Sequence, residues 1–175
     1  MTRFDTPYIS QLLEQMTAKL QDYLTSHQID EFHLIGIHSG GVWVAEALKE
    51  RLKHAAPLGA LNISFYRDDF SQRGLHPRVK PSNLPFDVEN AHVVLVDDVL
   101  MSGRTVRAAL NEIFDYGRPA SITLVTLFDV GRRELPVSPD VCGEPLALPI
   151  PLRVKVHGPA PLTADIIDPN KANHD

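Results

Sequence analysis

Apolar residues recur every three or four positions near the start of the chain, which is the period of a helix with one buried face. The residues of this face are Ile9, Leu12, Leu13, Met16, Leu20, Tyr23 and Leu24. Thr6 and Pro7 precede them and suit the N-cap and the first helical position. The same spacing predicts helices over residues 42–53 and about 103–116, and Gly117 then stands where a C-cap glycine belongs.

Between these helices the apolar residues form short continuous runs, which are typical of buried strands. The runs cover residues 32–37, 58–66, 93–96 and 121–128, and a candidate edge strand covers residues 152–156. Strands that alternate with helices predict an α/β fold with a central, mainly parallel sheet flanked by helices. The 175 residues fit one domain, with a tail from about residue 168 to residue 175 that we expect to be disordered.

The apolar pattern stops between Arg67 and Ala91, a stretch that contains one glycine and three prolines. A loop of this length is uncommon in a compact domain unless it has a function. Its basic residues before Pro81 are Arg67, Arg73, Arg78 and Lys80. The stretch is either a functional loop that meets an anionic ligand or a solvated surface loop.

Composition and charge narrow the class of protein. The formal net charge of −5 argues against nucleic-acid binding through bulk charge, although it leaves a local basic patch open. No apolar run approaches the length of a membrane span, and the first ten residues lack the apolar segment of a secretory signal. Cys142 is the single cysteine, so the chain has no internal disulfide, and these features together favour the cytoplasm.

The stretch "VVLVDDVLMSGRT", residues 93–105, carries the clearest chemistry. An apolar strand runs into Asp97 and Asp98, and a glycine flanked by hydroxyl residues opens the next helix. Ligands of open α/β sheets bind beyond the carboxyl ends of the strands, and a helix N-terminus there attracts anions. A phosphate held at residues 101–105 would leave the two carboxylates to meet hydroxyl groups, as a sugar phosphate requires. The alternative is a solvated acidic turn before a capped helix.

This stretch resembles the phosphoribosyl pyrophosphate motif of type I phosphoribosyltransferases. Further segments, "YRDDFS" (66–71), "DYGRPASI" (115–122) and "RRELPVSPDVCG" (132–143), are similar to the PyrR family, whose members are uracil phosphoribosyltransferases and pyrimidine operon regulators. The similarity runs from about residue 32 to 145. It implies the type I fold, with a small hood and a flexible loop beside the central sheet.

The resemblance implies that Asp97 and Asp98 hold the ribose hydroxyls and stabilise a cationic transition state. The loop for phosphoribosyl pyrophosphate consists of Val99, Leu100, Met101, Ser102, Gly103, Arg104 and Thr105. The pyrophosphate loop consists of His38, Ser39, Gly40 and Gly41, in place of the family's Thr-Arg-Gly, so one arginine is missing. His38 either compensates for that arginine or only caps a turn. Mg²⁺ is implied as a cofactor bound mainly through the substrate, with no direct protein ligand.

The base is expected beyond the strand that ends at Phe128. The residues of that region are Asp129, Val130, Gly131, Arg132 and Arg133. We expect the two arginines to face a ligand or RNA, Trp43 to be a core or interface residue, and Cys142 to be structural. The loop from Arg67 to Ala91 corresponds to the family's mobile loop over the substrate.

The sequence therefore predicts a uracil phosphoribosyltransferase that converts uracil and phosphoribosyl pyrophosphate to UMP and pyrophosphate. Two alternatives remain: a uridine-nucleotide-dependent RNA-binding attenuation regulator with little catalysis, or a phosphoribosyltransferase for another base. The expected partners are the substrates, UMP and an mRNA leader, with no membrane. Family resemblance implies a homodimer or an assembly of dimers.

Overall fold

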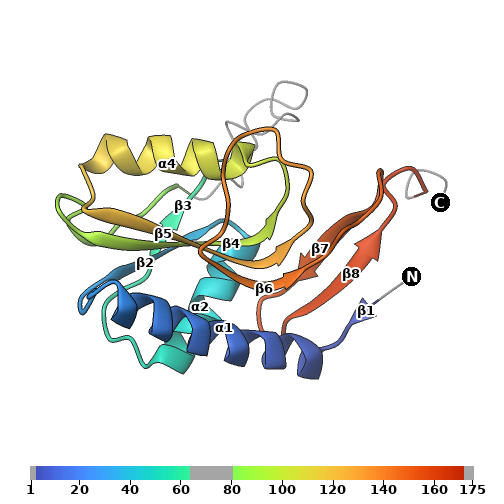
Figure 1. Ribbon diagram of the computed structural model, residues 1–175, viewed down its shortest axis with the longest axis horizontal. Helices are drawn as coiled ribbons and strands as arrows, with labels where there is room; N and C mark the ends of the chain where they lie inside the picture. The colour runs from blue at the N-terminus through green and yellow to red at the C-terminus, as the bar shows by residue number, and fades with distance from the viewer. Residues whose placement is uncertain (1–2, 64–80, 172–175) are drawn as a thin grey trace.

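The computed structural model describes residues 3–63 and 81–171 and contains a five-stranded sheet in the order β3-β2-β4-β5-β6 (Figure 1). Its strands are β2 (His33–Ile37), β3 (Gly59–Leu61), β4 (His92–Leu100), β5 (Ser121–Asp129) and β6 (Val141–Pro145). All neighbouring pairs in this sheet are parallel. The predicted α/β fold with a mainly parallel sheet is therefore confirmed.

In the described part of the chain, helices cover both faces of the sheet (Figure 1). Helices α1 (Thr6–Ser26) and α2 (Gly40–Leu52) lie on one face, and α4 (Arg104–Tyr116) lies on the other. The apolar face predicted for the first helix is buried at Ile9, Met16 and Leu20. Strands β4 and β5 lie between the two helical layers, which explains why their sequences are continuous apolar runs.

A small antiparallel sheet forms the hood, which we define as β1 (Arg3–Phe4), β8 (Thr163–Ile167) and β7 (Arg153–His157), in that order. Figure 1 shows it beside the end of the large sheet at which β4 and β5 terminate. Phe4 joins the two sheets, because its ring lies 5.1 Å from that of Phe128. The predicted edge strand near residues 152–156 is confirmed as β7, at the edge of the hood, while β1, β6 and β8 were not predicted.

Several element boundaries differ from the predictions for local reasons. Asp5, not Thr6, is the N-cap of α1, because its carboxylate accepts a hydrogen bond from the Tyr8 N–H at 3.0 Å. Gly117 follows α4 as predicted, but its φ of 162° is extended and not left-handed. It allows close packing instead, since a Cβ there would lie 3.0 Å from the Glu89 nitrogen.

The second half of the predicted long loop is ordered structure. Asn83 forms an antiparallel bridge with Ala60, and Val88 is buried while Leu84 and Phe86 pack against the core on the α4 side. Residues 81–91 contain no helix or strand, in agreement with the predicted loop, but these three apolar side chains anchor this part of it to the core. Residues 64–80 lie outside the described part of the chain.

The C-terminal segment is structured further than predicted. Asp168 accepts a hydrogen bond from the Lys171 N–H at 3.1 Å, so residues 168–171, expected in a disordered tail, form a turn. Residues 172–175 are outside the described ranges. Among the helices that the structure describes, none has the length and apolar character needed to cross a membrane.

Candidate active site

The paired acids lie within β4 and not after it. Pairing of β4 with β5 continues to Leu100, whereas pairing with β2 ends at Val96. Asp97 and Asp98 are therefore held by β5 on one side while they lie just beyond the carboxyl end of β2 on the other. The strand prediction that stopped at Val96 was too short, because a central strand continues wherever a neighbour supplies hydrogen bonds.

The N-terminus of α2 packs directly on this acid pair. A Cβ on Gly40 would overlap the carboxylate of Asp98, and one on Gly41 would lie 2.6 Å from the carbonyl oxygen of Val96. Two glycines are thus required for the close approach of the helix to β4. Half of the expected pyrophosphate loop is helical, because Gly40 and Gly41 begin α2, two residues before the predicted start, and only His38 and Ser39 precede it. The free N–H groups of this helix end face the same edge of the sheet as the acids.

The predicted phosphate loop forms a second helix N-terminus on the other side of the acids. Gly103 is the N-cap of α4 and has a φ of 92°, a left-handed conformation that other residues rarely adopt. A side chain at position 103 would strain the backbone. A Gly103→Val variant would therefore disturb the loop itself, and any loss of phosphate binding in it would not show that the phosphate approaches Gly103. The Ser102 hydroxyl accepts a hydrogen bond from the Arg104 N–H at 3.2 Å.

A cavity of about 180 Å³ adjoins this loop and connects it to Asp97 and to the hood. Its lining consists of Asp97, Val99, Leu100, Met101, Ser102, Gly103, Thr105, Val130, Arg153 and Val154. The structure thus brings one predicted acid, most of the predicted loop and one residue of the predicted base region into one cavity. Arg153 and Val154 were missed, because their strand could be predicted but its position against β4 could not.

Arg133 connects the phosphate loop to the end of β5. Its guanidinium donates to both carboxylate oxygens of Asp129, at 2.9 and 2.7 Å, and to the carbonyl oxygens of Met101 and Val137. This hydrogen bonding lowers the pKa of Asp129 below its ordinary value. Each nitrogen of the guanidinium thus has an acceptor inside the protein, and a contact of Arg133 with ligand or RNA stays a prediction.

Arg132 also turns inward. It donates from Nη2 to the carbonyl oxygen of Leu152 at 2.6 Å, and its Nε is buried without a hydrogen-bond partner among the described residues. Its own φ of 58° turns the chain toward the hood. Asp129, Gly131 and Arg132 line a second, more open hollow of about 620 Å³, together with residues 145–149. The residues predicted to bind the base therefore do not all line one cavity, and only Val130 among them lines the cavity beside the phosphate loop.

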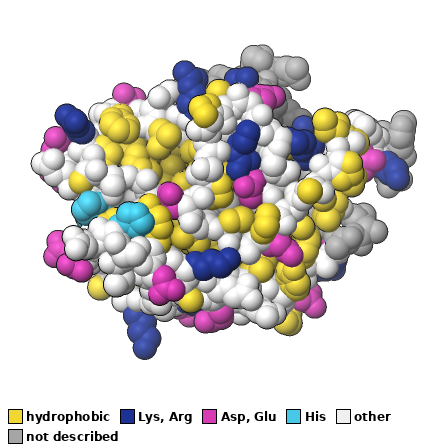
Figure 2. Space-filling model, in the orientation of Figure 1, with side chains coloured by type: hydrophobic (Ala, Val, Ile, Leu, Met, Phe, Trp, Pro, Cys, Tyr) yellow, Lys and Arg dark blue, Asp and Glu magenta, His cyan; other side chains and the backbone are white. Residues whose placement is uncertain are grey.

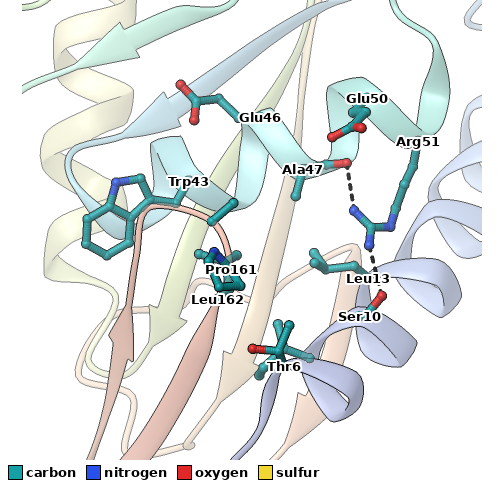
Figure 3. Close-up of a pocket in the computed structure, with 12 residues that line it drawn as sticks. Thr6, Ser10, Leu13, Trp43, Glu46, Ala47, Glu50, Arg51, Pro161 and Leu162 are labelled. Carbon is teal, nitrogen blue, oxygen red and sulfur yellow. Dashed lines mark hydrogen bonds between the residues drawn. The ribbon is translucent and has the colours of Figure 1, made fainter.

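A third hollow, of about 340 Å³, lies between α1, α2 and the turn that joins β7 to β8 (Figure 3). Arg51 is tied down there by hydrogen bonds to the Ser10 hydroxyl and the Ala47 carbonyl oxygen. Trp43 packs on the hood turn, since a Cβ on Gly158 would come within 2.6 Å of its ring. The prediction of a core or interface role for Trp43 fits this contact, and the hollow shares no residue with the acid cavity.

The remaining predicted residues are accounted for separately. Cys142 is half-buried on β6, and burial raises the pKa of its thiol, which suits a structural role. His38 donates its backbone N–H to the Leu61 carbonyl at 2.9 Å. The four basic residues predicted to meet pyrophosphate, Arg67, Arg73, Arg78 and Lys80, lie outside the described residues.

Comparison with known proteins agrees with this geometry. The family model for the phosphoribosyl transferase domain matches residues 4–144. A hypoxanthine-guanine phosphoribosyltransferase from Bacillus anthracis has a similar fold, with a TM-score of 0.70 and 15% identity over 94% of this chain and 96% of that chain. A hypoxanthine phosphoribosyltransferase from Trypanosoma cruzi gives a TM-score of 0.62 and 18% identity over 82% and 79%. Fold and site therefore define a type I phosphoribosyltransferase.

Closer relatives identify the family within this class. The protein named "Bifunctional protein PyrR" from Pseudomonas fluorescens is 58% identical over 162 residues, which cover 93% of this chain and 96% of the relative. Its counterpart from Pseudomonas aeruginosa is 57% identical over 159 residues, which cover 91% and 94%. This chain belongs to the PyrR family.

Proposed function

We propose that the chain converts uracil and phosphoribosyl pyrophosphate to UMP and pyrophosphate at the cavity between β4, the start of α4 and the hood. This is the activity of the PyrR family, so the chain is a uracil phosphoribosyltransferase. The contact between Gly40 and Asp98 supports the site most directly, because it places the acids between the N-termini of α2 and α4. Two anion sites with carboxylates between them suit a ribose that carries phosphate at one end and pyrophosphate at the other.

Residues 101–105 hold the 5-phosphate in this proposal. The N–H groups at the start of α4 and the hydroxyls of Ser102 and Thr105 are the donors, and the helix dipole adds favourable electrostatic energy. Arg133 keeps the loop in place through the Met101 carbonyl. The loop is thus preorganised for its ligand before substrate arrives.

Asp97 and Asp98 accept hydrogen bonds from the ribose hydroxyls and stabilise the charge that develops on the sugar. The C1–O bond to pyrophosphate breaks as N1 of uracil bonds to C1 of the ribose and releases its proton, and the ribose carries positive charge in the transition state between them. Asp98 stabilises this cation, while the N-terminus of α2 stabilises the negative charge on the leaving pyrophosphate. The pyrophosphate loop, His38 to Gly41, contains no arginine, so it relies on backbone N–H groups for this contact.

Mg²⁺ fits this site as an ion carried mainly by the substrate. Within residues 3–63 and 81–171 no group of three or more His, Cys, Asp or Glu side chains is arranged to hold a metal. One oxygen of Asp98 already accepts the Val99 N–H at 2.8 Å, which leaves the other for hydroxyls or water. Mg²⁺ tends to keep waters and substrate phosphates as ligands, and it would neutralise charge on the leaving pyrophosphate.

A direct assay tests the activity. The wild-type protein, given phosphoribosyl pyrophosphate and Mg²⁺ with uracil, cytosine, hypoxanthine or guanine in turn, should form a nucleotide only with uracil. Asp98→Asn should lower turnover roughly 100-fold or more without unfolding the protein. Asp115→Asn, at an exposed position of α4, is the matched control. A folded Asp98→Asn variant with wild-type turnover would remove the acids from the mechanism, and a nucleotide formed only with a purine would overturn the base assignment.

Regulation of pyrimidine genes is the second function of the PyrR family, and RNA is its expected ligand. We predict that binding of a pyrimidine-leader RNA is weak at physiological salt, because the net charge is −5. On the face drawn in Figure 2, Lys and Arg side chains are scattered among acidic ones and form no continuous basic area. Arg132 and Arg133 are engaged inside the protein, so neither is a ready phosphate contact.

Affinity for a leader RNA, measured across a salt series with and without UMP, tests this prediction. Tight, UMP-dependent binding at physiological salt would contradict it. A charge reversal on α1, Lys19→Glu, is a poor test of RNA binding. It would also remove a contact within the fold, because the Lys19 ammonium donates to the Cys142 carbonyl oxygen at 3.2 Å. A dimer or an assembly of dimers, and action in the cytoplasm, stay predictions that size measurement and cell fractionation can check.

A further inference from the structure

Arg153 lies across the cavity from the phosphate loop, at the first position of β7. Its neighbour Val154 is buried in the hood, whereas Arg153 itself is exposed and lines the same 180 Å³ cavity as Asp97, Ser102 and Gly103. A cation from the hood therefore faces the space in which a bound nucleotide would lie. No feature of the local sequence distinguishes this arginine from Lys155, two residues further along the same strand.

Other arginines around the cavity already have partners inside the protein. Arg133 is bound to Asp129 at 2.7 Å, Arg104 forms an ion pair with Glu134 at 2.5 Å, and Arg132 donates to the Leu152 carbonyl. The backbone of Arg153 pairs with Ile167 of β8, but its side chain makes no hydrogen bond or ion pair with any residue that the structure describes. Its planar guanidinium, with five donors and no acceptor, is thus available to a ligand.

The cavity has a polar half and an apolar half. Ser102, Gly103 and Thr105 form the polar half at the start of α4, where N–H groups and hydroxyls suit a phosphate. Val130 and Val154, both buried, form apolar walls on the hood side, where the flat faces of a base would fit. Arg153 reaches the cavity from β7, the strand that also supplies Val154.

We propose that Arg153 contacts the base of the nucleotide and contributes to the choice of base, an inference that rests on the proposed function of the cavity. Its guanidinium donates to a carbonyl oxygen at the edge of the base. Uracil has a carbonyl oxygen at C4 where cytosine has an amino donor, so a group that only donates hydrogen bonds favours uracil over cytosine at that edge. A site built to pair with a polar group discriminates strongly against a ligand that lacks it.

Binding of UMP and of ribose 5-phosphate, measured by calorimetry, separates a base contact from a phosphate contact. Arg153→Gln should raise the UMP dissociation constant about 10- to 100-fold, the loss expected for a hydrogen bond from a charged donor. The ribose 5-phosphate dissociation constant should stay at the wild-type value. Lys155→Gln removes the same charge from the same exposed face of β7 and should change neither constant. Arg153→Lys keeps the charge but loses the planar fork, so UMP binding should be intermediate.

Kinetics supply an independent reading. In Arg153→Gln the KM for uracil should rise, and the KM for phosphoribosyl pyrophosphate should not. Equal weakening of UMP and ribose 5-phosphate would overturn the proposal in favour of a phosphate contact, and unchanged UMP binding would overturn it outright. Both binding assays need no turnover, so they decide the role of Arg153 even if the wild-type protein forms no UMP, which would instead overturn the proposed function.

Discussion

Replacing Arg133 by methionine should destabilise the folded protein, although sequence reasoning placed this arginine against a ligand. Methionine keeps much of the volume of the side chain but removes its charge and all of its donors. Arg133→Met leaves the Asp129 carboxylate without its ion-pair partner and leaves the carbonyl oxygens of Met101 and Val137 without their donor. The substitution thus removes the hydrogen bonds that link Met101 of the phosphate loop to Asp129 at the end of β5.

The expected size of the effect follows from burial and geometry. The side chains of Arg133 and Asp129 are 23% and 19% exposed, so the pair is largely but not fully shielded from water. Breaking a buried pair by removing one partner costs roughly 3–5 kcal/mol, and the remaining exposure places this case near the lower end, about 3 kcal/mol. For a chain of this size, that loss corresponds to a decrease in Tm of about 6–12 °C.

Urea unfolding of the ligand-free protein is the assay, with thermal unfolding as a second measure. Arg107→Met is the matched control, because Arg107 is exposed on α4 and its side chain makes no hydrogen bond or ion pair within the described ranges. It should change stability by less than about 0.5 kcal/mol. Combining Arg133→Met with Asp129→Asn should cost less than the sum of the single changes, with a coupling of about 1–3 kcal/mol.

Normal stability of Arg133→Met would refute this reasoning, above all if UMP or RNA binding were lost at the same time. That result would indicate that the Arg133 side chain binds a ligand and contributes little to the stability of the fold, as the sequence suggested. Additive effects of Arg133→Met and Asp129→Asn would also contradict the ion pair, because independent residues do not couple.

Three further predictions concern the same site. Gly40→Ala should lower kcat/KM for phosphoribosyl pyrophosphate roughly 100-fold by forcing α2 away from Asp98, and wild-type kinetics would disprove the close contact. Amide hydrogen exchange should be slow at residues 81–91 even without substrate. In the rest of the predicted loop, residues 67–80, exchange should become slow only when phosphoribosyl pyrophosphate and Mg²⁺ are added. Equal exchange with and without substrate would argue against closure of the loop. Asp129 should stabilise the protein above its unfolded pKa, near 3.9, and this stability should be lost as the pH falls through its lower folded pKa, so wild type and Asp129→Asn should converge in acid.

Much of the fold was determined by local sequence. Apolar runs predicted β2, β4 and β5, and helical spacing predicted α1, α2 and α4, because each pattern depends on which side of a single element is buried. The position of the site was predicted from the single stretch Val93 to Thr105. It contains a strand, a turn and a helix start in sequence order, so its acids and its phosphate loop must lie close together.

Tertiary structure decided the contacts between distant segments. Phe4 pairs with Ala164 in the hood, and Arg153 reaches the cavity of Asp97, although neither pair is close in sequence. The spacing of apolar residues and the composition do not indicate which strands pair with one another, since many strand pairings would bury a similar apolar area. The hood and its contribution to the site could therefore not be predicted.

The direction of charged side chains was likewise decided by packing. Sequence shows Arg132 and Arg133 as adjacent cations in a loop, a pattern that suits ligand, RNA or solvent equally. The Leu152 carbonyl holds Arg132, and Asp129 with the Met101 and Val137 carbonyls holds Arg133, because acceptors inside the protein offset the cost of partly burying a guanidinium. Arg153, in an ordinary strand pattern, kept its donors available. Sequence determined which residues could carry charge at this end of the sheet, and the three-dimensional arrangement of acceptors decided which of them face the cavity.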